Sequence, residues 1–121
     1  MLRFLLDEDL RGPLWQAILR HNLQGLYPLD VIRVGDLAEL PRGSSDPSIL
    51  DWAMTARRIV ISADRSTMQM HLQDHIQSGR SSPGLLLVRP QAGVPEVLEF
   101  LIAAAYASEP GEWIDQCRFI P

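Results

Sequence analysis

A chain of 121 residues has the length of one domain, 1–121, which excludes a multi-domain machine. Its composition, 46% hydrophobic and 21% charged, is that of a globular protein and excludes a disordered or fibrous one. With 15 acidic against 11 basic residues, the net charge is −4, so the whole molecule does not attract nucleic acid electrostatically and a polyanion would have to meet a local patch.

Sequence features that report on location favour the cytoplasm. Cys117 is the only cysteine, so no intramolecular disulfide can form. The first apolar run is interrupted at Asp7, too early for the core of a signal peptide, and no run is long enough to cross a bilayer. We therefore expect a cytoplasmic protein with no membrane segment.

Short apolar runs alternate with amphipathic stretches along the chain, a pattern typical of α/β proteins. In chain order the pattern predicts a strand at 3–6, a helix at 13–21, a strand at 30–34, a helix from about 46 to 57, a strand at 58–63, a helix at 66–77, a strand at 84–88, a helix at 94–107 and an edge strand at 117–120. This order predicts a three-layer α/β/α fold around a mainly parallel sheet of about five strands, with helices on both faces.

Two of the predicted strands end in an aspartate, Asp7 and Asp64, and Asp46 opens a predicted helix. The carboxyl ends of parallel strands meet at one edge of a sheet, where functional crevices lie. Carboxylates that converge there repel one another, and a hard divalent cation with oxygen ligands is the usual compensation. Aspartates at strand ends also cap helices, so each of the three has a purely structural alternative.

Five segments resemble successive blocks of small bacterial PIN-like proteins, which are related to the VapC ribonuclease toxins of type II toxin–antitoxin pairs. These are LLDED at 5–9, DVIRVGDL at 30–37, SDPSILDWA at 45–53, RIVISAD at 58–64 and PGLLLV at 83–88. The resemblance covers residues 3 to about 88, with weaker similarity from Glu112–Trp113 to the end. It implies a PIN-like fold and a metal-dependent endoribonuclease that hydrolyses RNA phosphodiesters.

The resemblance also implies roles for individual residues. Asp7, Asp46 and Asp64 match acids of the PIN motif, so they are the expected catalytic and metal-holding residues, with Mg²⁺ or Mn²⁺ as the cofactor. PIN nucleases usually have a fourth acid shortly after the third, where this chain has Ser66 or Thr67. Both hydroxyls are weaker ligands than a carboxylate. Asp9 is a further candidate that supplies charge or caps a helix.

The expected partners follow from the same resemblance. Single-stranded RNA is the substrate and a small antitoxin protein the partner, and Arg11, Arg42 and Arg65 are weak candidates for binding RNA phosphates. A homodimer face is a further candidate, either around Leu14 and Trp15 or on the alanine-rich last helix.

Two alternatives to a ribonuclease stay open. A PIN-fold protein with an incomplete acid set could act by binding a protein partner without cleaving RNA, and the same acids could serve a DNA-directed nuclease. His71 and His75, one turn apart on a predicted helix, have a spacing suited to metal binding. Without an assigned third ligand, we interpret them as an exposed polar helix face.

Overall fold

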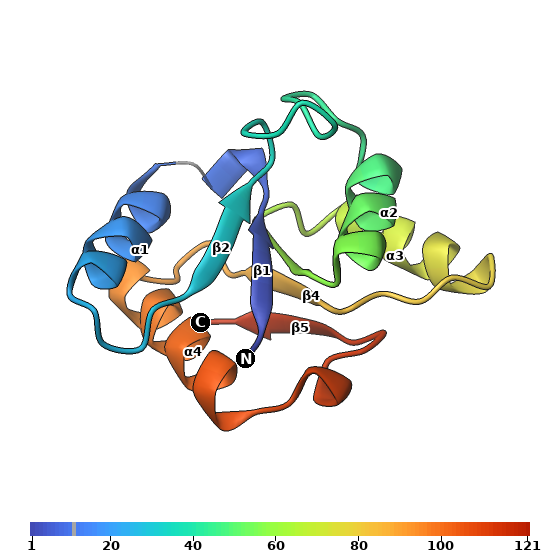
Figure 1. Ribbon diagram of the computed structural model, residues 1–121. Helices are drawn as coiled ribbons and strands as arrows, with labels where there is room; N and C mark the ends of the chain where they lie inside the picture. Colours follow the sequence, from blue (N-terminus) through green and yellow to red (C-terminus); the bar gives the residue numbers. More distant parts are fainter. Residues whose placement is uncertain (11) are drawn as a thin grey trace.

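A computed structural model describes residues 1–10 and 12–121 and shows four α-helices packed on a five-stranded sheet (Figure 1). The strands are β1 (Arg3–Leu6), β2 (Asp30–Arg33), β3 (Ile59–Ser62), β4 (Leu85–Val88) and β5 (Cys117–Ile120). The helices are α1 (Pro13–Leu23), α2 (Asp46–Ala56), α3 (Met68–Gln77) and α4 (Val94–Ala107), with short 3₁₀ turns η1 (Glu8–Leu10) and η2 (Pro110–Glu112). The predicted elements and their order are confirmed, and so is the α/β fold class.

All neighbouring strands pair in parallel, in the order β2-β1-β3-β4-β5. The chain moves outward from β1 to β2 and then returns to the other side of β1, so the order reverses between β1 and β3. Crevices for ligands form at such a reversal, outside the carboxyl ends of the strands. Leu6 is in register with Ile61, which brings the ends of β1 and β3 side by side at this edge.

The helices cover both faces of the sheet, as the right-handed crossover rule predicts. On one face α1 and α4 pack over Phe4, Leu6 and Ile61. On the other face α2 and α3 pack over Leu5 and Val60. Successive strand residues point to opposite faces, so nearly continuous apolar strands can supply two cores, as buried parallel strands do.

Several boundaries differ from the sequence prediction by one or two residues, and the start of the third helix has a clear physical reason. The third helix was expected to begin at Ser66, but α3 begins at Met68. The amide groups of Ser66 and Thr67 donate to the Asp64 carboxylate, so these two residues belong to a turn. Side chains of Asp commonly compete with helical hydrogen bonds in this way.

Residues proposed for a homodimer face lie largely inside the fold. Leu14, Ala104 and Ala105 are buried in the core. Trp15 is half-buried, with the guanidinium of Arg33 located 4.3 Å from the centre of its ring. A homodimer stays a prediction, but the buried members of both proposed faces cannot contribute to it. Among the described residues, no helix has the length and apolarity needed to span a membrane.

Ser45 caps α2, the helix that begins with the candidate ligand Asp46. Its side-chain oxygen accepts a hydrogen bond from the Ser48 amide at 3.3 Å. We expect Ser45→Ala to lower the free energy of unfolding by about 1 kcal/mol, because this helix-terminal amide loses its partner. Thermal or urea unfolding measures the change. A loss below about 0.2 kcal/mol would contradict the capping role, and Ser45→Asp should retain the cap as a matched control.

Candidate functional site

Asp7 lies at the carboxyl end of β1 and is almost fully buried. Its Oδ1 accepts a hydrogen bond from the Glu8 amide at 2.8 Å, and its Oδ2 accepts one from the Ser62 hydroxyl at 2.9 Å. Burial raises the pKa of Asp7, the Ser62 hydrogen bond opposes the increase, and the charge of Asp46 adds to it. The fold therefore holds this carboxyl group in a fixed orientation at a cost in desolvation.

Asp64 follows β3 and organises the turn that leads into α3. Its Oδ1 accepts hydrogen bonds from the Ser66 amide, the Ser66 hydroxyl and the Thr67 amide at 3.0–3.1 Å. The Thr67 hydroxyl also contacts Oδ2. Hydrogen bonds from Thr67 and Ser66 lower the pKa of Asp64 to about 2, despite some desolvation. Asp64 is thus ionised throughout the physiological pH range.

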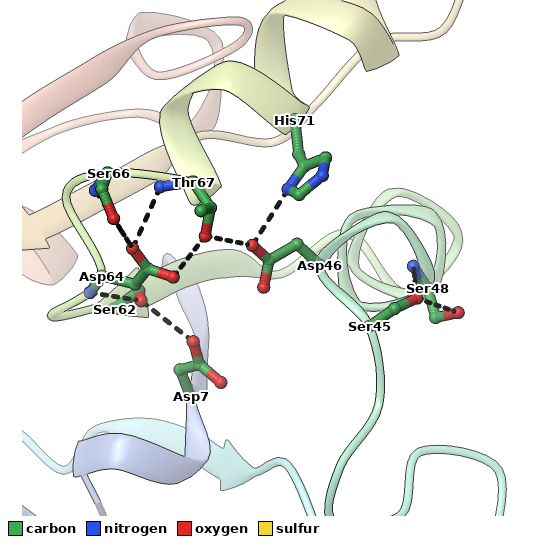
Figure 2. A network of polar contacts seen from close by, with 9 residues as sticks. All are labelled: Asp7, Ser45, Asp46, Ser48, Ser62, Asp64, Ser66, Thr67 and His71. Atoms are coloured by element: carbon green, nitrogen blue, oxygen red, sulfur yellow. Dashed lines mark hydrogen bonds and ion pairs between the residues drawn. The ribbon is translucent and has the colours of Figure 1, made fainter.

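The Thr67 hydroxyl connects two of the predicted site acids (Figure 2). It contacts Asp64 Oδ2 and lies 2.9 Å from Asp46 Oδ2. A hydroxyl has a single hydrogen, so it can donate to only one of the two carboxylates at a time. The other oxygen–oxygen contact is repulsive while both acids are ionised. The Thr67 hydroxyl alone therefore cannot satisfy both carboxylates.

For His71 the expectation of an exposed polar face holds only in part, whereas for His75 it is wrong. The side chain of His71 is only partly exposed, and its Nδ1 lies 3.0 Å from Asp46 Oδ2. An ionised carboxylate has no hydrogen to give, so Nδ1 must be protonated in this contact. Figure 2 shows the resulting chain of polar contacts, which continues through Thr67 to Asp64. His71 therefore orients Asp46.

The same expectation is wrong for His75, which is buried. Its Nε2 donates to the backbone carbonyl of Ser81 at 2.8 Å, and its Nδ1 lies 3.5 Å from Asp51 Oδ1. Arg80 also pairs with Asp51. His71 and His75 therefore have different partners in the structure.

Asp9 in η1 completes the acidic region. Desolvation and the charges of Asp7 and Asp64 raise the pKa of Asp9 to about 6, while the Ala63 amide lowers it. Asp7 and Asp46 interact electrostatically as well. The structure therefore brings together all three predicted acids and the additional candidate Asp9, from segments that are far apart in the sequence.

The raised pKa of Asp9 predicts a pH-dependent gain in stability for Asp9→Asn. Below pH 3.8 Asp9 is protonated in the folded and the unfolded chain, so it does not change the free energy of unfolding. Above pH 6 Asp9 is ionised in both, and the full loss in the free energy of unfolding is present. Because Asp9 is exposed, solvent screens these charges, and we expect a gain of roughly 1 kcal/mol. This corresponds to an increase of about 4 °C in the melting temperature at pH 7.5. At pH 3.5 the increase should disappear, and an equal increase at both pH values would contradict the assignment.

Two of the arginines predicted to contact RNA are described by the structure. Arg42 and Arg65 are both exposed. The Gly43 amide next to Arg42 donates to Glu8 Oε1 at 2.9 Å, which ties this loop to the segment after β1. Arg65 directly follows Asp64. Arg11 lies outside the described residues.

The chemistry of the donors suits a divalent cation such as Mg²⁺ or Mn²⁺. Asp7, Asp46 and Asp64 offer carboxylate oxygens, and Thr67 adds a hydroxyl, all of which are hard ligands. Among residues 1–10 and 12–121, however, no three His, Cys, Asp or Glu side chains are grouped as ready metal ligands. The oxygens of Asp7 and Asp64 instead accept hydrogen bonds from Ser62, Thr67 and backbone amides. The residues fit the cation by type and charge, and binding it would require some of these hydrogen bonds to be replaced.

Sequence reasoning missed Ser62 and considered His71 only as a metal ligand or as part of an exposed helix face. Ser62 is a fully buried hydroxyl at the end of an otherwise apolar strand, and it joins Asp7 to the backbone of Asp64. A single polar residue at the end of an apolar strand could have indicated this role from the sequence. His71 lies one helical turn after Thr67. It reaches the site only because α3 packs against α2, which begins at Asp46, and the sequence does not reveal this packing.

Comparisons with protein-family models, with curated proteins and with solved structures found no match for this chain.

Proposed function

We propose that this protein is a metal-dependent endoribonuclease in which Asp7, Asp46 and Asp64 hold Mg²⁺ or Mn²⁺. The observation that carries the proposal is that Asp46 and Asp64 share the single hydrogen of the Thr67 hydroxyl beside the β1/β3 reversal, where the charge of Asp46 also acts on Asp7. A cation there would relieve the repulsion between the acids.

The protein groups have distinct roles in this proposal. Ser62 fixes one oxygen of Asp7, and His71 fixes one oxygen of Asp46. The turn at Ser66 and Thr67 keeps Asp64 ionised. A bound divalent ion would supply the positive charge that activates water and stabilises the phosphodiester during its displacement. Asp9 adds negative charge at the edge of the site.

The direct test is incubation of the protein with single-stranded RNA and DNA of matched sequence in Mn²⁺, in Mg²⁺ or in EDTA. We expect cleavage of RNA in the presence of metal and none in EDTA. Equal cleavage in EDTA would contradict the proposal, and cleavage of DNA alone would favour the DNA-directed alternative.

The resemblance to VapC toxins adds an expectation about the partner. If the chain is the toxin of a pair, its expression should arrest bacterial growth, and co-expression of a small antitoxin protein should restore it. Growth arrest that persists unchanged in Asp64→Asn would argue against RNA cleavage as its cause.

A second candidate is a PIN-fold module that binds a protein partner without cleaving RNA. Ser66 and Thr67 occupy the place of the expected fourth acid, and their hydrogen bonds satisfy the oxygens of Asp64 without a metal. A folded protein that cleaves neither nucleic acid in either metal would support this candidate.

A further inference from the structure

A groove of about 410 Å³ adjoins the acidic site at the same edge of the sheet. Its lining comes from the segments that follow β1, β3 and β4 and from the amino-terminal parts of α1 and α4. Asp9 lines the groove, and its carboxyl group also interacts with the charges of Asp7 and Asp64. A molecule in the groove would therefore lie next to the acids.

The floor of the groove is largely apolar. Leu14 and Val97 contribute from the core, and Leu10, Val88 and Val94 are half-buried. The volume lies within the range of sites for small organic groups, roughly 300–1,000 Å³. The flat face of a nucleobase is suited to such a floor, because its contact removes apolar surface from water.

Two arginines, Arg65 and Arg89, stand at the rim of this groove and are exposed. Within the described part of the chain neither forms an ion pair, whereas Arg33 and Arg58 each contact an aspartate. The Arg89 guanidinium lies 5.1 Å from the centre of the Phe119 ring, a contact that positions the group without neutralising it. In a molecule with a net charge of −4, two unneutralised guanidinium groups beside one groove are well placed to bind phosphates.

The amino-terminal end of α1 adds hydrogen-bond donors to the same groove. Gly12 and Pro13 line it, and Gly12, the residue that precedes the helix, provides no side-chain cap. Pro13 has no amide hydrogen and the Gln16 amide donates to the Gly12 carbonyl at 3.2 Å, so in this first turn only the amides of Leu14 and Trp15 lack a partner within the helix and can favour an anion. This end of α1 supplements the arginines and does not define the site alone.

We propose that this groove binds one nucleotide of the single-stranded RNA, with the base on the apolar floor and neighbouring phosphates on Arg65 and Arg89. The assignment rests on the proposed nuclease function, because it places the scissile phosphate at the adjacent acids. Binding of a single nucleotide in this way restricts the substrate to unpaired segments, since a paired base would not be free to enter the groove.

The test measures binding separately from cleavage. A short fluorescein-labelled single-stranded RNA of mixed sequence is titrated with the full chain in EDTA, and fluorescence anisotropy is recorded from about 50 to 200 mM salt. Arg65→Gln and Arg89→Gln should each weaken binding by about fivefold and reduce the salt slope by about 0.7, the value for one lost phosphate contact. Ala92→Leu, which narrows the groove without changing its charge, should weaken binding while leaving the salt slope unchanged.

Arg3→Gln is the matched control, because Arg3 begins β1 at the opposite end of the strand from Asp7. It should change neither affinity nor slope, and thermal unfolding verifies that every variant is folded. Absence of RNA binding, or equal effects of Arg3→Gln and the two groove arginines, would overturn the groove assignment. Binding that depends on the groove, in a protein that cleaves no RNA in Mn²⁺ or Mg²⁺, would support the groove and contradict the nuclease.

Discussion

Asp64→Asn is expected to reduce metal-dependent RNA cleavage by roughly 100-fold or more while the protein stays folded. The variant removes a negative charge from the proposed cation site. Its amide oxygen can still accept the hydrogen bonds from Ser66 and the Thr67 amide, and its NH₂ group can donate to the Thr67 hydroxyl. Initial cleavage rates with Mn²⁺, together with circular dichroism, measure both parts of this expectation.

The same substitution has a predictable cost in stability. Asp64 has a pKa of about 2, below its unfolded value of 3.8, so its stabilising contribution is present above about pH 4 and lost as the pH falls toward 2. The variant should lose roughly 1 kcal/mol at pH 7. Glu99→Gln, an exposed neutralisation on α4, is the control and should change neither cleavage nor stability. Undiminished cleavage by Asp64→Asn would remove Asp64 from the catalytic site.

Ser66→Asp is expected to tighten Mn²⁺ binding by roughly tenfold and to increase cleavage at low metal concentration. The Ser66 hydroxyl lies 3.1 Å from Asp64 Oδ1, so an aspartate there places a second carboxylate beside the first. Without metal the two charges repel, and the melting temperature should fall by a few degrees. Added Mn²⁺ should reverse this decrease. Cleavage that appears only in Ser66→Asp would identify the natural protein as the non-catalytic module.

Matched measurements on Ser66→Asn separate charge from size. Asparagine has nearly the same shape as aspartate but carries no charge, so it should neither lower the melting temperature in EDTA to the same extent nor tighten Mn²⁺ binding. If both variants behaved alike, the effects of Ser66→Asp would come from disruption of the Asp64 turn rather than from an added ligand.

The positions of Asp7 and Asp64 were predictable from sequence because the chemistry is local. Each follows a short apolar run, and parallel strands present their carboxyl ends at one edge whatever their order. Asp46 was predictable as the start of a helix from Ser45 and Pro47. Strand order, by contrast, depends on the side of β1 on which each later strand is added. The hydrophobic periodicity of the sequence carries no information about that side.

The histidines show why the rest of the site was not predictable. A spacing of four residues places His71 and His75 on one helix face, but it does not say what that face meets. In the structure His71 meets Asp46 at the amino end of α2, and His75 packs between Asp51 and the Ser81 carbonyl. The contacts with Asp46 and Asp51 join segments separated in sequence and arise from the packing of α3 against α2, whereas the Ser81 carbonyl lies in the loop that follows α3.

Binding of Mn²⁺ at neutral pH is the measurement that tests the cation site most directly, because it requires no knowledge of the RNA target. The loss of the free Mn²⁺ signal in electron paramagnetic resonance would be followed for the full chain, for Asp7→Asn, for Asp64→Asn and for the control Glu99→Gln. We expect saturable binding in the full chain and the control, and strongly weakened binding in both aspartate variants. No saturable binding by the folded chain, or equal binding by all four proteins, would contradict a cation site formed by these acids.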